Sequence, residues 1–388
     1  MAKSVKALRL AAVAEQHAPA AMTTSSPPPL KTPMAVAEPP RAAAPKFPTK
    51  IFPSKVSNTN RQLRLQSRPK NLLAPGDLRL AESPVPELKD GQALARVKYL
   101  SIDPTMRVWM VADTYLPAVA IGEVMRAFGF AEIIESCHPD YKNGDRVTGL
   151  TGLQEYVVLD DSAKRSFQKI PKIPFVSDTV FLGVLGINGP TAFFGMEIAQ
   201  PKKGETLVVS AAAGATGSIA GQIGKIHGCR VVGIAGTDEK CAWITKDLGF
   251  DAAINYKRPD WKEKLAAATP NGIDIDFENV GGEIMQEVLN RMKLFGRVVL
   301  CGLISGYTKE DPSLASFGTV LVKRLRVQGF IILDYASRFM EAATQLGQWK
   351  MFGKLKDRET IVEGLEKAPD AINMLFTGGN TGKLIVKV

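Results

Sequence analysis

One segment near the middle of the chain limits the possible folds more than any other feature. Residues 206–210 (TLVVS) form a short apolar, β-branched run that predicts a strand. A loop of small residues follows, and Gly214, Gly217 and Ala220 have the spacing G-x-x-G-x-x-A at the start of a predicted helix. Glycine lets the backbone approach a pyrophosphate closely, and the N–H groups of a helix N-terminus attract phosphate. The segment predicts a dinucleotide site; the alternative is a close-packed glycine turn without a ligand.

Strands and helices alternate around this segment from about residue 180. The predicted strands are residues 206–210, 230–235, 252–255, 273–277 and 296–301. The predicted helices between them are residues 218–227, 239–248, 262–268 and 282–293. Short connections in a βαβα series are typical of a doubly wound parallel sheet, so the expected fold class is α/β.

The second predicted strand of this unit decides between the two nicotinamide dinucleotides. NAD sites have an acid at the end of that strand, which binds the ribose 2′-OH. Here the strand ends at Ala235 without an acid, and Asp238 and Glu239 come later, in the first turn of the next helix. Lys240 can neutralise a 2′-phosphate, so we predict NADPH rather than NADH as the cofactor. Alternatively, Lys240 is a solvated lysine on the face of the helix.

The residues before the parallel sheet have a different pattern. Short apolar or alternating segments are separated by Pro, Gly and Asp, which predicts a small β-rich domain. These segments are residues 93–99, 129–134 and 155–159. We expect this domain to cover residues 58–179 and the parallel-sheet domain to cover residues 180–339. Residues 340–388 are predicted to return to the first domain, with a last strand at 383–388.

The first 57 residues carry much of the net charge of the chain. They contain eight Lys or Arg and two acids, which is +6 of the total +10, and they are rich in Ala and Pro. Such a segment cannot bury enough apolar surface to fold alone, so we predict a disordered extension or a mis-assigned start. The alternative is an organelle transit peptide, because the segment is basic and poor in acids. The expected location is the cytoplasm, with organelle import as the alternative in a eukaryote.

The rest of the composition excludes several classes of protein. The remaining residues carry only about +4, with no basic patch interleaved with aromatic residues, so we expect no nucleic-acid partner. No run of 18 apolar residues is present, so no membrane span is predicted. Four cysteines without a C-x-x-C pair are typical of a reduced intracellular protein.

Residues for metal or nucleophilic chemistry are scarce. His17, His138 and His227 lie far apart in the sequence, which leaves little for a metal site or a histidine-based triad. No Gly-Lys-Ser/Thr follows the glycine loop, so a nucleotide-hydrolysing phosphate loop is rejected. Hydride transfer needs neither feature, because the cofactor carries the reaction. We therefore expect a zinc-free oxidoreductase.

Eight further motifs are specific to one group of enzymes. They are residues 99–107 (YLSIDPTMR), 121–125, 138–145, 182–192, 210–217, 277–282 (FENVGG), 301–305 and 380–383 (NTGK). Over residues 58–388 the chain resembles the zinc-independent medium-chain dehydrogenases/reductases, in the branch of alkenal double-bond reductases, prostaglandin reductases and curcumin reductases. The resemblance implies a GroES-like β-rich domain joined to a Rossmann domain, and a homodimer.

The resemblance also implies a set of cofactor residues. Those expected at the pyrophosphate are Gly214, Ala215, Thr216 and Gly217. Lys240 and Tyr256 are expected at the adenosine phosphate. Those expected at the ribose and nicotinamide are Asn279, Cys301, Phe330 and Asn380. For Tyr256 and Cys301 the alternative is plain packing at the ends of strands.

Two departures from this family concern the proton donor. Thr105 stands where such reductases have a tyrosine in D-P-Y-M-R, and Val322 stands where plant and mammalian relatives have another. Tyr115 matches a tyrosine of the curcumin reductase branch, and Tyr307 matches a residue that covers the substrate. Both are candidate catalytic residues, Tyr115 first; the alternative for each is a pocket wall without a proton role.

The activity implied by the resemblance is the NADPH-dependent reduction of the C=C bond of α,β-unsaturated aldehydes and ketones. Hydride would reach the β-carbon, and a tyrosine or ribose hydroxyl would stabilise the enolate. One alternative is a zinc-free quinone reductase or alcohol dehydrogenase of the same fold. The other is a non-catalytic NADPH-binding protein, because fold does not determine function.

Overall fold

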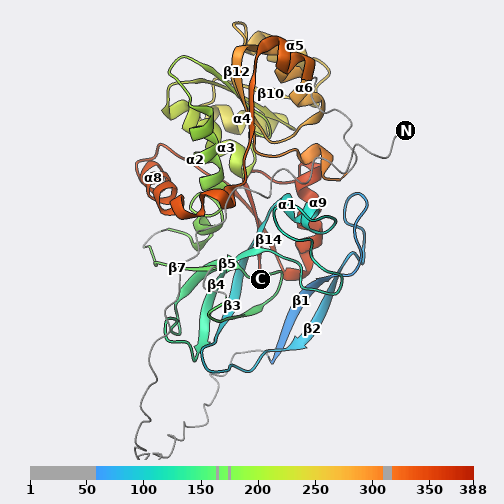
Figure 1. Ribbon diagram of the computed structural model, residues 1–388, viewed down its shortest axis with the longest axis vertical. Coiled ribbons are helices and arrows are strands. Elements are labelled where there is room, and N and C mark those ends of the chain that lie inside the picture. The colour runs from blue at the N-terminus through green and yellow to red at the C-terminus, as the bar shows by residue number, and fades with distance from the viewer. Residues whose placement is uncertain (1–57, 163–165, 174–175, 309–316) are drawn as a thin grey trace, which may run out of the picture. The chain divides into compact units, whose positions relative to one another are not determined.

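The computed structural model describes residues 58–162, 166–173, 176–308 and 317–388. The predictions for residues 1–57, a disordered extension or a transit peptide, lie outside the described residues. The described residues belong to one compact unit, Val56–Val388. Within it the strands form a six-stranded sheet, a seven-stranded sheet and a two-stranded pair (Figure 1).

The six-stranded sheet is parallel throughout and has the order β10-β9-β8-β11-β12-β13. Its strands are β8 (Thr206–Val209), β9 (Arg230–Ala235), β10 (Ala252–Asn255), β11 (Ile273–Glu278), β12 (Met292–Leu300) and β13 (Arg326–Gly329). The helices that follow its first four strands in the chain are α3 (Ala215–Ile226), α4 (Asp238–Lys246), α5 (Trp261–Ala268) and α6 (Gly282–Arg291). The predicted α/β class and doubly wound sheet are therefore confirmed. Strand β13 is an addition to the predicted set.

The two faces of this sheet are covered by different helices, because successive side chains of a strand point to opposite faces. Leu207 and Val209 of β8 belong to a core with α2 (Asn188–Ala199), α3, α4 and α8 (Phe339–Met351). Val208 belongs to a second core with Trp261 of α5 and Val288 of α6. Strands of this kind are apolar along their whole length, since both faces are buried.

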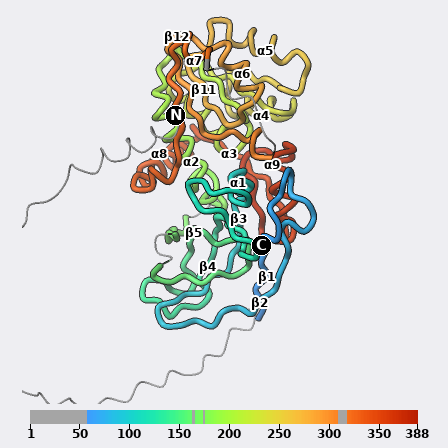
Figure 2. The backbone as a smooth tube through the Cα atoms, turned by 45° about the vertical axis from the view of Figure 1, so that its right-hand side comes forward, coloured from blue at the N-terminus to red at the C-terminus, as the bar shows by residue number. Residues whose placement is uncertain are grey.

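The second large sheet combines strands from residues 93–170 with the last two strands of the chain. Its order is β14-β15-β3-β4-β5-β7, and β6 also pairs with β3. The strands are β3 (Ala93–Ile102), β4 (Phe128–Ser136), β5 (Arg146–Leu150), β6 (Tyr156–Leu159), β7 (Phe167–Ile170), β14 (Glu359–Glu363) and β15 (Lys383–Lys387). Figure 2 shows the C-terminus among the blue and green strands, in agreement with the antiparallel pairing of β15 with β3. The chain thus returns to the sheet that holds β3 to β7.

The predicted domain limits stay a prediction, but the contacts of α8 bear on where the return begins. Ala342 and Leu346 of α8 are fully buried in the core on the α2 face of the six-stranded sheet. The chain joins the other sheet only at β14. Residues 340–351 thus pack with the parallel sheet.

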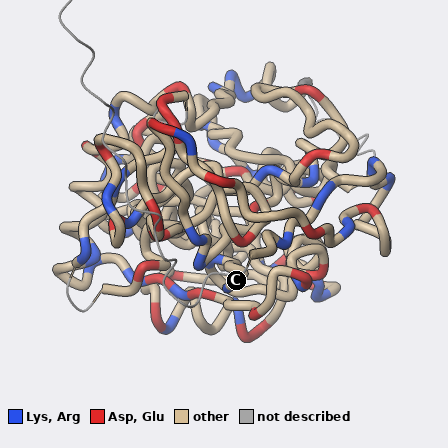
Figure 3. Tube along the Cα trace, turned by 90° about the horizontal axis from the view of Figure 1, so that it is seen from below, with Lys and Arg blue, Asp and Glu red and all other residues tan. Residues whose placement is uncertain are grey.

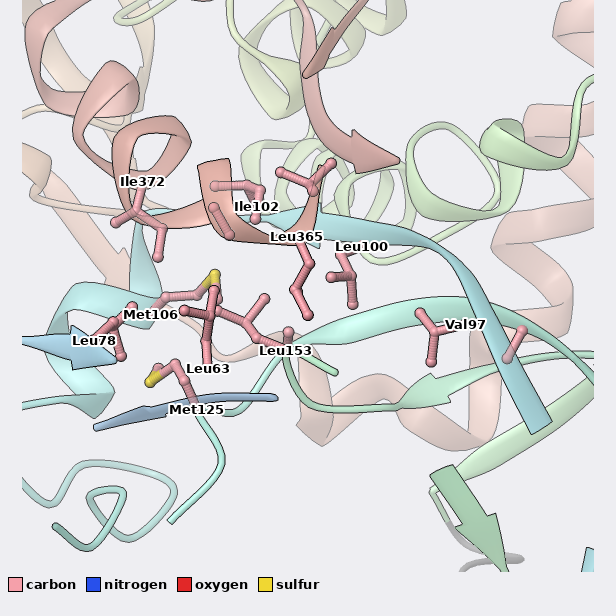
Figure 4. Packing of buried hydrophobic residues seen from close by; sticks show 14 of the residues in the cluster. Leu63, Leu78, Val97, Leu100, Ile102, Met106, Met125, Leu153, Leu365 and Ile372 are labelled. Carbon is pink, nitrogen blue, oxygen red and sulfur yellow. The ribbon is translucent and has the colours of Figure 1, made fainter. Parts of the chain in front are cut away.

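The second sheet has its own core, shown in Figure 4. Leu63 of β1 (Thr59–Leu65), which pairs with β2 (Leu78–Pro84), packs there with Leu100 of β3. Met106 of α1 (Thr105–Trp109) and Ile372 of α9 (Ala368–Thr377) close the same cluster. A helix near the C-terminus therefore helps to hold the segment that follows β3 in place.

The charged residues of the described chain are mixed in sign along the trace. Figure 3 shows Lys and Arg interspersed with Asp and Glu over the face seen from below. Many form ion pairs, such as Arg338 with Glu197 at 2.8 Å. Among the described residues, no helix is both long and apolar enough to cross a bilayer.

Candidate functional site

The turn between β8 and α3 has the backbone geometry that the glycine pattern predicts. Ala211 has a φ of 48°, in the left-handed region, and Gly214 is the N-cap of α3 without a side-chain capping hydrogen bond. A Cβ at Gly217 would lie 2.5 Å from the carbonyl oxygen of Ala211. Only glycine fits there without moving backbone. The first turn of α3 therefore keeps N–H groups that can bind an anion.

Ser210 and Glu278 join the ends of β8 and β11 beneath this turn. Both are fully buried, and Ser210 Oγ donates to Glu278 Oε1 at 2.7 Å. The same carboxylate oxygen accepts from the backbone N–H groups of Val280 at 2.5 Å and Gly281 at 2.8 Å. Burial raises the pKa of Glu278, and these hydrogen bonds oppose the shift. Glu278 thus shapes the loop that carries Asn279.

Asn279 is the first of the expected nicotinamide and ribose residues. Its backbone N–H donates to Ser210 Oγ at 2.7 Å, and its Nδ2 donates to the Ser210 carbonyl at 2.7 Å. Cys301 lies close by, since its N–H donates to the Glu278 carbonyl at 2.9 Å. Burial, and then the Glu278 carboxylate, raise the pKa of Cys301 to about 12. Cys301 is therefore a neutral thiol at physiological pH.

Phe330 and Asn380 reach the same edge of the sheet from other elements. Phe330 directly follows β13, is half-buried and makes an edge contact with Tyr335, with ring centroids 6.3 Å apart. Asn380 is buried and its Nδ2 donates to the Gly382 carbonyl at 3.1 Å. Gly382 N–H in turn donates to the Ala213 carbonyl at 2.8 Å, beside the glycine turn. The carboxyl ends of parallel strands are where such folds bind ligands.

The end of β9 carries the residues expected at the adenosine phosphate. Thr237 caps α4, with its Oγ1 accepting from the N–H of Lys240 at 3.2 Å. Lys240 Nζ donates to the Gly378 carbonyl at 2.9 Å, and burial, with Lys257 nearby, lowers its pKa. The Tyr256 ring lies against Gly236, where a Cβ would be 3.2 Å from the ring edge.

The acid that follows β9 is turned away from this position. The carboxylate of Asp238 pairs with Arg258 and accepts from Asn255 Nδ2 at 2.7 Å. The hydrogen bonds from Arg258 and Asn255 hold the pKa of Asp238 below its usual range. The end of β9 itself, Ala235 and Gly236, carries no acid, and Lys240 and Lys257 bring positive charge to the region, while the Glu239 carboxylate accepts a hydrogen bond from Thr237.

The candidate tyrosines have different surroundings. Tyr115 is 43% exposed, and its hydroxyl forms a 2.8 Å hydrogen bond with Thr105 Oγ1, in which either group can donate. Tyr307 is half-buried, and its hydroxyl accepts from the Leu303 N–H at 3.3 Å. Burial, with Cys301 and Tyr115 as further causes, raises the pKa of Tyr307.

A cluster that the sequence did not indicate lies next to the glycine turn. Asp103, two residues before Thr105, accepts from Lys383 Nζ at 2.7 Å and from Asn188 Nδ2 at 3.3 Å. Burial raises the pKa of Asp103, but Lys383 and further hydrogen bonds from Ser101 and Asn188 leave it below its usual range. These residues are up to 280 positions apart, so periodicity and local spacing carry no signal of the cluster.

Comparisons with known proteins agree with this arrangement. A family model described as the N-terminal domain of oxidoreductase matches residues 61–168, and one described as zinc-binding dehydrogenase matches residues 215–348. In the described residues, however, no group of three or more His, Cys, Asp or Glu side chains could hold a metal ion.

Relatives with established names cover most of the chain. The NADPH-dependent curcumin reductase of Escherichia coli K12 is 44% identical over 340 residues, which is 85% of this chain and 97% of that enzyme. The NADP(+)-dependent 2-alkenal reductase of Nicotiana tabacum is 39% identical over 295 residues, which is 75% of this chain and 85% of that enzyme. The crystal structure of CurA from Vibrio vulnificus in complex with NADPH has a TM-score of 0.79 at 42% identity, covering 84% of this chain and 99% of CurA. The chain therefore belongs to the zinc-independent medium-chain dehydrogenase/reductase family of curcumin, alkenal and prostaglandin reductases.

Proposed function

We propose that the protein uses NADPH to reduce the C=C bond of α,β-unsaturated aldehydes or ketones. The observation that carries this proposal is the set of candidate residues gathered at the carboxyl ends of β8, β9, β11 and β12, in a chain whose relatives are NADPH-dependent reductases. The cofactor, when bound, supplies the hydride. The protein supplies binding, orientation and a hydroxyl for the substrate oxygen.

The residues of the glycine turn fit a dinucleotide in three respects. The position of Gly217 has no room for a side chain, so a pyrophosphate can approach the backbone. The uncapped start of α3 offers N–H groups to its oxygens. Lys240 and Lys257 lie beyond the end of β9, where a 2′-phosphate needs a cation and where NAD sites have an acid. This arrangement favours NADPH over NADH.

The substrate oxygen is proposed to bind at Tyr115. Thr105 replaces the family tyrosine of the D-P-Y-M-R motif, but its hydroxyl is bonded to that of Tyr115. Thr105 can accept from Tyr115 or donate to it, so the Tyr115 hydroxyl can stabilise a developing enolate and then pass on its proton. Tyr307 is the second candidate, since its phenol stays protonated over a wider pH range.

The test is NADPH oxidation by the purified protein with a panel of enals, enones, quinones and simple alcohols. We expect turnover with enals or enones and none with alcohols and NADP. Tyr115→Phe should lower kcat by about 10- to 100-fold with a small change in the KM for NADPH, as expected for loss of an acid–base group. Tyr99→Phe, in strand β3, is the matched control. Turnover with quinones alone would overturn the proposal in favour of a quinone reductase.

We further propose that the protein is a homodimer formed through β13. This strand is the last of the six-stranded sheet, and all four of its residues are exposed. The side chains of Leu294, Phe295, Leu321 and Val322 are also exposed, between 56% and 76%. An open strand edge beside apolar side chains is suited to pairing with a second copy. Light scattering should give a dimer mass, and Leu321→Asp a monomer mass; a monomeric parent would refute this.

The cytoplasm is the proposed location. Fluorescent fusions of the full chain and of residues 58–388 should both be diffuse in the cytoplasm. Accumulation of only the full chain in an organelle would instead identify residues 1–57 as a transit peptide.

A further inference from the structure

Asn188 connects the two sheets through a single amide nitrogen. It is the first residue of α2 and is only 9% exposed. Its Nδ2 donates to Asp103 Oδ1 at 3.3 Å and to Thr216 Oγ1 at 3.3 Å. Asp103 directly follows β3, whereas Thr216 is the second residue of α3. The amide therefore bridges the sheet of β3 to the turn expected to hold the pyrophosphate.

The chemistry of Asp103 decides which way this amide faces. An ionised carboxylate can only accept hydrogen bonds, so Asn188 must present its NH₂ group rather than its oxygen. Lys383, 4% exposed and 2.7 Å from the same carboxylate oxygen, keeps Asp103 ionised in a buried position. One amide proton is then directed at Asp103 and the other at Thr216. The amide oxygen has no hydrogen-bond partner among the described residues.

The direction of the amide also decides the direction of the Thr216 hydroxyl. A hydroxyl has one proton to donate and two lone pairs. Because Thr216 Oγ1 accepts from Asn188, the lone pair on that side is occupied and the hydroxyl proton must point elsewhere. Thr216 lies in the first turn of α3, where the helix N–H groups attract phosphate.

We propose that Asn188 is a positioning residue for the dinucleotide. Its amide is held by the Asp103–Lys383 pair and orients the Thr216 hydroxyl, so that the hydroxyl proton is donated to the cofactor pyrophosphate. The inference rests on the proposed function, because it requires Thr216 to face that pyrophosphate. Its consequence is that the affinity for NADPH depends on a carboxylate of the other sheet.

The test compares two ligands that share the adenosine 2′-phosphate and differ in the pyrophosphate. NADPH has the pyrophosphate, whereas adenosine 2′-monophosphate has no phosphate at the 5′ position. Asn188→Ala should weaken NADPH binding by about 3- to 10-fold, the range of one hydrogen bond, and leave the Kd for adenosine 2′-monophosphate unchanged. Thr216→Val should have a similar effect, and the double variant should be no weaker than either single variant. Titration calorimetry gives the Kd and the stoichiometry of each; if Asn188→Ala fails to fold, Asn188→Ser is measured instead.

The matched control is Asn373→Ala in α9. Asn373 also makes two hydrogen bonds, both 2.9 Å and both to the backbone of Leu73. This variant should lower the Tm and leave both Kd values unchanged. Equal weakening of NADPH and adenosine 2′-monophosphate binding by Asn188→Ala, or full additivity with Thr216→Val, overturns the inference. A parent that binds NADPH but reduces no enal or enone overturns the proposed function alone, since the Kd ratios still test Asn188.

Discussion

At the scale of single residues, Asp276 is a buried acid whose carboxyl group lacks hydrogen bonds within the described structure. It lies in the middle of β11, is fully buried, and neither carboxylate oxygen has a hydrogen-bond partner among the described residues. Its neighbours across the sheet are Val208 and Val298. Burial, with the Glu278 charge as a further cause, raises the pKa of Asp276 well above its usual value. Burial therefore favours the protonated form of Asp276 in the folded protein.

This shift makes the stability depend on pH. Unfolded Asp loses its proton near pH 3.9, whereas folded Asp276 keeps it to a higher pH. Between the pKa of the unfolded and that of the folded Asp276, the folded state binds one more proton than the unfolded state. The free energy of unfolding therefore falls as pH rises. Asp276→Val should add about 1–3 kcal/mol at pH 7 by removing the unpaired group, and should flatten this pH dependence.

Urea denaturation at pH 5, 7 and 8.5 measures the effect. The control is Asp274→Val on the same face of β11, because Asp274 accepts from the Thr206 N–H at 2.8 Å and from Lys293 at 2.8 Å. That variant should lose stability. If Asp276→Val were also less stable than the parent at pH 7, the Asp276 carboxyl would make a stabilising interaction, which contradicts the prediction.

At the scale of elements, the turn from β9 into α4 decides the cofactor. Lys240 is held by the start of α4, close to the end of β9. Lys240→Ala should remove one charge-assisted contact to the 2′-phosphate, which contributes about 1.5–3 kcal/mol. The Kd for NADPH should therefore rise by about 10- to 100-fold. NADH binding should not change. Lys246→Ala, in the last turn of the same helix, is the control, and fluorescence titration with both dinucleotides is the measurement.

The sequence predicts elements well where one physical signal dominates. Strands β8 and β9 are apolar on both faces, and the predicted ranges match to within one residue. Strand β12 was expected at residue 296 but begins at Met292, because Met292 pairs with Ile273 before a bulge interrupts the register. Phe295, with a φ of 63°, lies at that irregularity. A bulge depends on the pairing with the neighbouring strand, so the local sequence pattern does not predict it.

At the scale of the whole molecule, part of the site likewise cannot be predicted from local sequence patterns. The glycine turn is local, so Gly214 and Gly217 could be recognised from their spacing, whereas Ala215 and Thr216 were named through the family resemblance. Asn380 and Phe330 could be named only through the family resemblance. The contacts of Asp103 with Lys383 and Asn188 join residues 85 to 280 positions apart, and they exist only after β15 has paired with β3. Packing between elements, rather than propensity, decides this part of the site.

The ion pair of Asp103 with Lys383 is where that packing can be tested. Lys383 Nζ also donates to the Ile102 carbonyl at 3.2 Å, and the pair is largely shielded from solvent. Lys383→Met leaves a buried charge without its partner, so the free energy of unfolding should fall by about 3–5 kcal/mol at pH 7. The double variant Lys383→Met/Asp103→Asn should recover part of this loss, since it buries no charge.

The pH dependence of these variants separates the ion pair from simple packing. The pKa of folded Asp103 is below its usual value, so the parent gains stability from the pair above about pH 4 and loses it as pH falls through the folded pKa. The difference between parent and Lys383→Met should narrow on acidification, because without Lys383 burial raises the pKa of Asp103 and the variant neutralises this carboxylate at a higher pH; urea denaturation from pH 7 to pH 3.5 measures it. A difference that stays constant over this range would mean that Lys383 acts through its apolar stem alone, and that the charge of Asp103 does not hold the two sheets together.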